Sequence, residues 1–239
     1  MIVWVSSFPR SGNTFLRIIL NRLYGVRTSV VYDRDGVAER LGDDLVGYED
    51  RPATYDAMRA SPDPHFVKTH RRRDDLVDDG DKAVCLVRDG RDSLVSWARL
   101  TSEKDSSTFA TELRAMIDRE ADVGTGSWGH NVLSWLQLSV PHRVMLRYED
   151  LTREPRASVE RVMTALLPGL RPRENAPIPT FADLQHVDGT FFRRGRSGTH
   201  QDELPDDLHE LFWSKADNTA AMTLLGHRRP ETEAGNVRR

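Results

Sequence analysis

Two segments of this 239-residue chain have the residue types and spacing of an anion-binding site. In the first, the apolar run at residues 2–6 leads through a tight loop into a helical pattern. Backbone N–H groups at a helix start are unpaired and carry the positive end of the helix dipole, so they stabilise an anion. Gly12 lets the backbone approach a ligand closely, and Arg10 adds positive charge. Further side-chain donors can come from Ser11, Asn13 and Thr14. The alternative is an ordinary strand–turn–helix junction capped by serine and asparagine.

The second segment follows the apolar run at residues 82–88. Arg88 is expected at the carboxyl end of a strand, which is where open α/β sheets bind ligands. Ser96 is expected about one turn inside the next helix, so both side chains could converge on one phosphate. Asp92 between them is expected to cap that helix or to pair with Arg91, rather than to contact a ligand.

A cation and an imidazole lie two residues apart at the end of the apolar run 65–68. Positions i and i+2 of an extended chain lie on the same side, so Lys68 and His70 are expected to face one cleft. A histidine in such a place can act as a general base. A single histidine is more often structural, and that is the interpretation for His65 and His142.

These side chains need a scaffold that brings several strand ends together. Short β-branched runs alternate with helical patterns, which is typical of α/β proteins with a parallel sheet. The expected strands are 2–6, 65–68, 82–88 and 143–148. The expected helices are 13–24, 92–99, 108–121, 131–138, 156–167 and 207–214. Residues 28–64 are expected to form loops with short helices, and the charged residues 228–239 a flexible tail.

Composition excludes several classes of function. A formal net charge of -3 argues against broad nucleic-acid binding, which needs a large basic surface. No stretch reaches the roughly 18 apolar residues of a membrane span. The apolar run at residues 1–5 is too short for a secretory signal, so a cytoplasmic location is expected. The single cysteine, Cys85, can form no intrachain disulfide and is expected to be buried in a strand.

The loop at residues 7–15 resembles the 5′-phosphosulfate loop of sulfotransferases that use 3′-phosphoadenosine 5′-phosphosulfate (PAPS). The usual form of that loop is Tyr-Pro-Lys-Ser-Gly-Thr-Thr-Trp. Arg10 replaces its lysine but keeps the charge, and Phe15 replaces its tryptophan but keeps a ring able to stack on adenine. In the nucleotide-kinase loop Gly-x-x-x-x-Gly-Lys-Ser/Thr, by contrast, Ser7 and Asn13 would replace the first glycine and the lysine. Kinases need that lysine with Mg²⁺ to neutralise β,γ-phosphates, whereas a terminal sulfuryl group carries less charge.

Five further motifs follow in the order of the same family. The segment 88–96 resembles its 3′-phosphate motif, Arg-Asn-Pro-Arg-Asp-x-x-x-Ser, and Lys-Thr-His at 68–70 resembles its catalytic segment. Tyr148 begins a segment similar to a Tyr-Glu-Asp element at a strand end, while Thr180 and Phe181 resemble a Ser-Phe element beside adenine. Residues 193–198 resemble an Arg-Lys-Gly-x-x-Gly loop that closes over the 3′-phosphate. In that loop the matching residues are Arg193, Arg194 and Gly195.

The resemblance covers residues 2–198 and implies a compact, bacterial-like member of the cytosolic-type PAPS-dependent sulfotransferases. The implied fold is a P-loop-like central parallel β-sheet, flanked by helices on both sides, in one domain at residues 1–227. The implied reaction is in-line transfer of a sulfuryl group from PAPS to an acceptor hydroxyl, which leaves adenosine 3′,5′-bisphosphate (PAP) and needs no metal. His70 would take the proton of the acceptor, while Lys68 and Arg10 would balance the developing negative charge.

The sequence leaves the acceptor open. A small-molecule hydroxyl is expected, with carbohydrate or lipid hydroxyls as alternatives, because residues 28–64 and 101–127 show neither a sugar-binding aromatic cluster nor a strongly basic stripe. Two other functions stay open: a small P-loop kinase and a non-catalytic nucleotide-binding module. The missing Gly-Lys pair argues against the first, and Lys68 with His70 argues against the second. No nucleic-acid or membrane partner is expected, and the oligomeric state is open.

Overall fold

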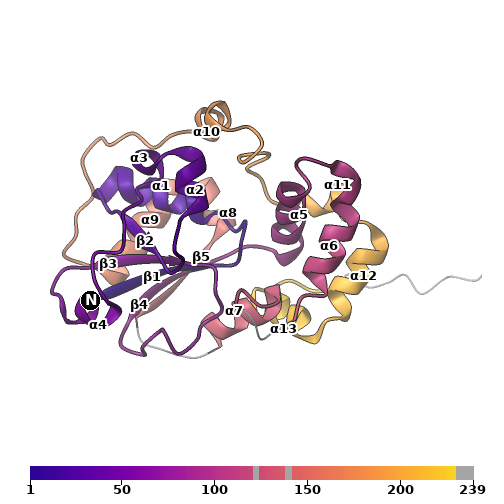
Figure 1. The fold of residues 1–239 in the computed structure, drawn as a ribbon, viewed down its shortest axis with the longest axis horizontal. Helices are drawn as coiled ribbons and strands as arrows, with labels where there is room; N and C mark the ends of the chain where they lie inside the picture. The colour runs from indigo at the N-terminus through magenta and orange to yellow at the C-terminus, as the bar shows by residue number, and fades with distance from the viewer. Residues whose placement is uncertain (121–123, 138–141, 230–239) are drawn as a thin grey trace, which may run out of the picture.

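A parallel five-stranded sheet with the order β2-β3-β1-β4-β5 forms the centre of the molecule (Figure 1). The structure is a computed structural model and describes residues 1–120, 124–137 and 142–229. The strands are β1 (Ile2–Ser7), β2 (Thr28–Val30), β3 (His65–Thr69), β4 (Lys82–Val87) and β5 (Arg143–Arg147). The predicted α/β class with a parallel sheet is confirmed. Strand β2 was not predicted, because three residues are too few to show a period of two.

Helices cover both faces of the sheet, as the sequence predicted. Successive strand residues point to opposite faces, and β1 divides its side chains accordingly. Val3 and Val5 pack with residues of α1 (Asn13–Tyr24) and α9 (Pro155–Leu166). Ile2 and Trp4 pack in a separate cluster with residues of α4 (Tyr55–Ala60) and α7 (Trp128–Leu136). Cys85 lies in this second cluster and is buried, as predicted.

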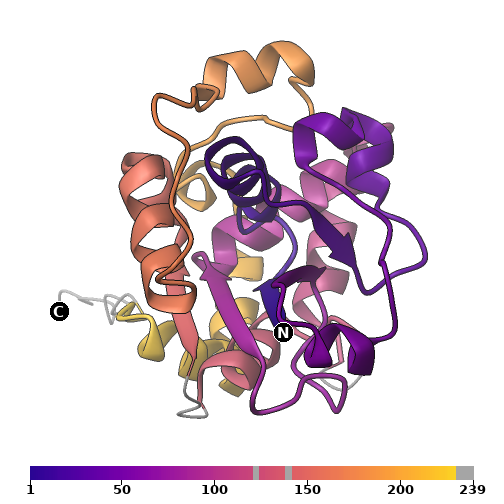
Figure 2. The same cartoon turned by 90° about the vertical axis from the view of Figure 1, so that its left-hand side faces the viewer.

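The other helices of the described chain form two groups. Beside the sheet lie α5 (Gly90–Thr101), α6 (Phe109–Ile117), α11 (His200–Glu203), α12 (Asp206–Ser214) and α13 (Ala216–Leu224), together with a short 3₁₀ helix (Ser106–Thr108) (Figure 1). Near α1 lie α2 (Gly36–Leu41), α3 (Asp43–Val46), α8 (Tyr148–Arg153) and α10 (Phe181–Val187). Figure 2 shows α10, in orange, at the top of the molecule above α1.

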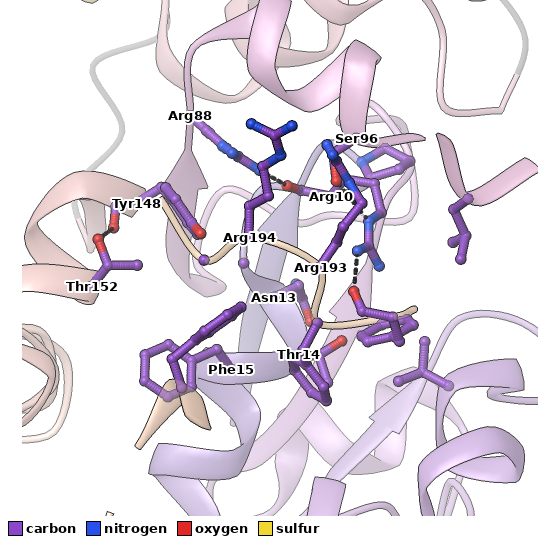
Figure 3. A pocket seen from close by; sticks show the side chains of 18 of the residues that line it. Arg10, Asn13, Thr14, Phe15, Arg88, Ser96, Tyr148, Thr152, Arg193 and Arg194 are labelled. Atoms are coloured by element: carbon purple, nitrogen blue, oxygen red, sulfur yellow. Dashed lines mark hydrogen bonds between the residues drawn. The ribbon is translucent and has the colours of Figure 1, made fainter. Parts of the chain in front are cut away.

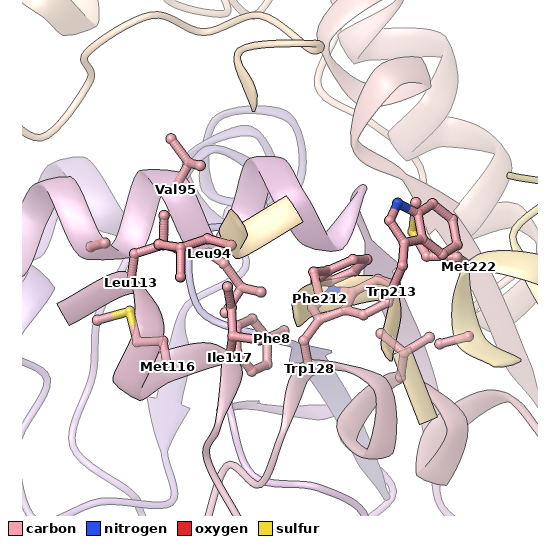
Figure 4. Close-up of a cluster of buried hydrophobic side chains, with 14 of the residues drawn as sticks. Phe8, Leu94, Val95, Leu113, Met116, Ile117, Trp128, Phe212, Trp213 and Met222 are labelled. Atoms are coloured by element: carbon pink, nitrogen blue, oxygen red, sulfur yellow. The ribbon is translucent and has the colours of Figure 1, made fainter. Parts of the chain in front are cut away.

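A large hydrophobic cluster joins the helices beside the sheet, among them α5, α6, α12 and α13, to the sheet itself (Figure 4). It contains Trp128 of α7, together with Phe212 and Trp213 of α12. Phe8 enters this cluster from the loop after β1 and is 2% exposed. Burial of a ring of this size contributes about 2 kcal/mol or more, so Phe8 anchors the loop between β1 and α1.

Most predicted helices occur with shifted ends. The helix predicted at 92–99 is longer at both ends, and the one predicted at 131–138 begins at Trp128. Residues 121 and 138, at the predicted ends of two helices, lie outside the described residues, as do residues 230–239 of the predicted tail. The domain boundary at residue 227 stays a prediction. No helix in the described ranges has the length and apolar character needed to span a bilayer.

Candidate nucleotide-binding and catalytic site

The two predicted anion-binding segments follow neighbouring strands, β1 and β4. The chain leaves β1 through α1 towards β2, on one side of the sheet, and leaves β4 through α5 towards β5, on the other. Ligands of open α/β sheets bind where such connections diverge, outside the carboxyl ends of the strands. A cavity of about 390 Å³ opens at this place.

Nearly all predicted site residues line this cavity. Figure 3 shows Arg10, Arg88 and Ser96 on one side of it, with Thr14 and Phe15 on the other. The predicted residues that line the cavity are Arg10, Gly12, Asn13, Thr14, Phe15, His70, Arg88, Ser96, Tyr148, Thr180, Phe181, Arg193, Arg194 and Gly195. Ser11 and Lys68 are not part of its lining.

The start of α1 is open to a ligand. Gly12 precedes the helix with a φ of 97°, and no side chain caps the helix. A Cβ atom at this position would lie 2.7 Å from the ring of Tyr148, so only glycine fits both the conformation and the contact. The first-turn N–H groups of α1 therefore face the cavity without a capping side chain, which is the arrangement that binds phosphates.

Two side chains of this loop are already engaged within the protein. The Ser11 hydroxyl lies 3.3 Å from the Ser93 hydroxyl, away from the cavity. The Asn13 amide group donates to the Val5 carbonyl oxygen (3.2 Å) and to the Ser7 hydroxyl (3.1 Å). These hydrogen bonds engage the side chains of Ser11 and Asn13 within the protein, and their predicted contribution to anion binding stays a prediction.

Arg10 and Arg88, the cationic residues of the two anion-binding segments, lie beside each other in the wall of the cavity. Arg10 donates from Nε to the Ser96 hydroxyl (3.2 Å) and from a terminal nitrogen to the Phe191 carbonyl oxygen (2.5 Å). Arg88 donates to the backbone carbonyl of Arg10 (3.0 Å) and lies 4.2 Å from the centre of the Tyr148 ring. Burial, followed by the charge of Arg88, lowers the pKa of Arg10 to about 10.

Asp92 is placed differently from the sequence prediction. Asp89, not Asp92, caps α5 and pairs with Arg91 at 2.7 Å. Asp92 is fully buried and accepts hydrogen bonds from Gly198 N–H (2.7 Å) and from Nδ1 of His200 (2.7 Å). Burial opposes ionisation of Asp92, but the His200 hydrogen bond and the charge of Arg88 outweigh it and hold its pKa at about 2. Asp92 therefore fastens the 193–198 loop beside Arg88.

The arginines of this loop are paired with carboxylates of α11. Arg193 lies 2.8 Å from Glu203, and Arg194 lies 3.2 Å from Asp202. Gly195 has a φ of 58°, and a Cβ atom there would lie 2.3 Å from the Phe181 ring. The loop thus packs directly on Phe181, at the mouth of the cavity. Thr180 caps α10 by accepting from Asp183 N–H.

Lys68 and His70 differ in exposure. Only His70 lines the cavity, because β3 ends at Thr69 and the chain turns there. Lys68 is buried in the last part of β3, and burial lowers the pKa of its ammonium group to about 8, although the charge of Asp35 opposes this. The prediction that both side chains face one cleft therefore holds in the structure for His70 and not for Lys68.

The protein fixes the tautomer of His70. Nδ1 lies 2.9 Å from the Ser7 carbonyl oxygen, which can only accept, so Nδ1 carries the proton. The lone pair is then on Nε2. Burial, followed by the charge of Lys68, lowers the pKa of His70 well below its ordinary value. A neutral imidazole with a free Nε2 lone pair can accept a proton at neutral pH.

Sequence reasoning missed three residues of the site: Ser7, Asp92 as a loop anchor, and Phe191. Ser7 ends a strand and shows no local pattern that points to His70, 63 positions away. Phe191 lies 4.4 Å below the Arg10 guanidinium, and aromatic residues beside an arginine-rich segment are the one signal that could have indicated it. Among the described residues, no group of His, Cys, Asp or Glu side chains is arranged to hold a metal ion.

Comparisons with known proteins agree with this geometry. The family model described as "Sulfotransferase domain" matches residues 2–166. Sulfotransferase 1A1 of Rattus norvegicus is 25% identical over 171 residues, which cover 68% of this chain and 58% of the rat protein. The Bos taurus protein of the same name is 24% identical, over 87% of this chain and 79% of its own length.

Two solved structures share the fold. A mouse sulfotransferase, SULT7A1, complexed with PAP superposes with a TM-score of 0.65 at 17% identity, over 95% of this chain and 89% of the mouse chain. Retinol dehydratase in complex with androsterone and inactive cofactor PAP superposes with a TM-score of 0.63 at 20% identity, over 97% of this chain and 83% of the dehydratase chain. Because the family model matches more than half of the sequence and the fold agrees, the chain belongs to the sulfotransferase family.

Proposed function

We propose that the protein transfers a sulfuryl group from PAPS to an acceptor hydroxyl. The observation that carries this proposal is the meeting of Arg10 and Arg88 at one cavity wall, beside the uncapped start of α1. Burial, followed by the positive charge of Arg88, lowers the pKa of Arg10, so repulsion from Arg88 adds to the cost of burying this charge. An anion with two separate phosphate-type groups would relieve this repulsion.

The residues of the cavity fit such a ligand. Arg88 has a buried Nε–H without a partner among the described residues, and α1 offers its first-turn N–H groups. In this proposal Arg10 to Thr14 hold the 5′ end, while Arg88, Ser96 and the loop of Arg193 and Arg194 hold the 3′-phosphate. Phe15 and Phe181 present rings for the adenine, and Tyr148 packs against Gly12. The two PAP complexes named above support this assignment at the level of the fold.

The proposed chemistry falls to three side chains. PAPS supplies the activated sulfuryl group. His70 accepts the proton of the acceptor hydroxyl at Nε2, while Ser7 holds the opposite ring nitrogen. Arg10 balances charge on the donor, and Lys68 contributes a positive charge close enough to lower the pKa of His70. A fixed cation at a developing negative charge typically contributes about 3 to 4 kcal/mol to transition-state stabilisation.

The acceptor is proposed to be a small molecule with an apolar body. Val37, Trp97 and Leu100 add apolar surface to the cavity near Arg10. A carbohydrate or lipid hydroxyl is the alternative, and the acceptor assay decides between these classes.

The test is a transfer screen with PAPS and a panel of phenols, aliphatic alcohols, sugars and lipid alcohols, followed by mass spectrometry. We expect a sulfated product together with an equal amount of PAP, without added metal. The same panel with ATP and Mg²⁺ tests the kinase alternative. Phosphorylated product with ATP, and no sulfated product with PAPS, would refute the proposal.

A further inference from the structure

Tyr32 contacts both Lys68 and His70, the proposed catalytic residues of β3 and its end, although no motif in the sequence points to it. It lies two residues after β2, which pairs in parallel with β3 so that Val30 is beside Lys68. The pairing continues past the strand, because Val31 N–H donates to the Lys68 carbonyl oxygen (3.3 Å). This register brings residue 32 to the level of His70, at the carboxyl edge of the sheet.

The hydroxyl and the ring of Tyr32 make different contacts. The hydroxyl accepts a hydrogen bond from the His70 backbone N–H at 2.9 Å. The ring faces the Lys68 ammonium, with Nζ 5.1 Å from its centre. A cation held over an aromatic face is stabilised electrostatically, and more strongly where water is excluded.

The Lys68 ammonium has few other partners. It makes no hydrogen bond or ion pair with another described residue. The ionisable groups around it are Arg17 on α1, Asp35 before α2, and the neutral His70. Asp35 is itself bound to Arg17 at 2.6 Å, with both side chains buried, so its charge is largely balanced by Arg17. Among the described residues, the Tyr32 ring is therefore the direct contact of the ammonium, and Asp35 adds a longer-range attraction.

We propose that Tyr32 is a positioning residue for sulfuryl transfer: its ring holds the Lys68 ammonium, and its hydroxyl fixes the backbone that carries His70. This inference rests on the proposed function. Tyr32 does not line the cavity and is 38% exposed at the sheet edge, so it acts through its two neighbours.

Two substitutions separate the two contacts. Tyr32→Phe removes the hydroxyl and keeps the ring, whereas Tyr32→Leu removes both. Tyr48→Phe is the matched control, because it removes a phenol hydroxyl from the same part of the chain, where that hydroxyl bonds to Asp50. Circular dichroism and thermal melting establish that each variant is folded.

The deciding measurement is NMR, which needs no acceptor. Hydrogen exchange at the His70 amide should be about fivefold faster or more in Tyr32→Phe and Tyr32→Leu, since each loses a hydrogen-bond acceptor. The chain has four lysines, so ¹³C-lysine signals can be assigned and titrated. The pKa of Lys68 should stay near its wild-type value in Tyr32→Phe and fall by about half a pH unit in Tyr32→Leu. Unchanged exchange and titration in both variants would overturn the inference.

Turnover of PAPS with 4-nitrophenol then tests the link to chemistry. We expect kcat to fall in the order wild type, Tyr32→Phe, Tyr32→Leu, with the KM for PAPS unchanged. Equal kcat in all three proteins refutes a role in the transfer step. Calorimetry with PAP separates the two claims: a wild-type protein that does not bind PAP contradicts the proposed function, whereas normal PAP binding with unaltered variants contradicts only the role of Tyr32.

Discussion

The proposed phosphate end of the site, formed by Arg10 and Arg88, and its proposed chemical end, formed by His70 and the buried Lys68, differ in their electrostatics. At the phosphate end, Arg10 keeps its positive charge at physiological pH, even though burial lowers its pKa to about 10. At the chemical end, burial lowers the pKa of Lys68 to about 8 and that of His70 well below its ordinary value, so His70 is neutral. The first end is suited to holding anions, and the second to moving a proton.

The contacts of the two ends differ in the same way. Arg10 and Arg88 are fixed by carbonyl oxygens and by the Ser96 hydroxyl, groups whose charge does not change with pH. His70 is held by Ser7 through one ring nitrogen only, which leaves the other for chemistry. Substitutions at the first end should therefore change nucleotide affinity, and those at the second should change rate. Four predictions test this division.

The largest effect is expected for His70→Ala. Removal of the proposed base should lower kcat by about 10² to 10⁴-fold, because general-base catalysis contributes about that much. The affinity for PAP, measured by calorimetry, should stay within about twofold, since no phosphate contact is proposed for the imidazole. His65→Ala, at the other end of β3, is the control and should behave as wild type. Wild-type turnover in His70→Ala would remove His70 from the mechanism.

Next in size is the loss of nucleotide affinity in Arg88→Ala. Charge-assisted hydrogen bonds contribute about 1.5 to 3 kcal/mol, so PAP should bind about 10- to 100-fold more weakly. Adenosine 5′-monophosphate, which lacks the 3′-phosphate, should bind almost as it does to wild type. Arg91→Ala, which removes an arginine that pairs with Asp89 and does not line the cavity, is the control. An equal loss for both nucleotides would place Arg88 away from the 3′-phosphate.

The pH dependence of kcat/KM should report the protonation states of Lys68 and His70. In the proposed mechanism, transfer requires neutral His70 and protonated Lys68. Because the pKa of His70 is lowered, the imidazole stays neutral at mildly acidic pH and the rate should not fall there. The rate should fall as the pH rises through about 8, where Lys68 loses its proton. Lys68→Arg should move this alkaline limb to higher pH, because arginine stays charged. Lys82→Arg should leave the profile unchanged, and an alkaline limb near 8 that survives Lys68→Arg belongs to another group.

The smallest effect is expected for Ser96→Ala. Its hydroxyl accepts from Arg10 Nε, and one such hydrogen bond contributes about 1 kcal/mol. PAP affinity should fall about fivefold, with kcat less affected. Ser102→Ala, at the end of the same helix, serves as the control for a lost hydroxyl. A larger change in kcat than in affinity would contradict the proposal that the hydrogen bond between Arg10 and Ser96 serves mainly nucleotide binding.

The same division separates what the sequence could predict from what it could not. The loop at Arg10 and the segment from Arg88 to Ser96 are continuous motifs, and strand order alone brings them to one cavity. Asp92 and His200 are 108 positions apart, and no local pattern links them. Tyr32 reaches Lys68 and His70 only because β2, too short to detect, pairs with β3. The contacts that sequence reasoning missed are therefore those between residues far apart in the chain, which only the folded structure brings together.

The most direct test of the account is calorimetric titration of the wild-type protein with PAP in the presence of a metal chelator, and with ATP and Mg²⁺ in parallel. Because two separate cationic sites line one cavity, PAP should bind with a Kd on the order of micromolar without metal, and ATP with Mg²⁺ should bind far more weakly. Binding of ATP with Mg²⁺ in the absence of any PAP binding would contradict the claim that Arg10 and Arg88 hold the two ends of a bisphosphate.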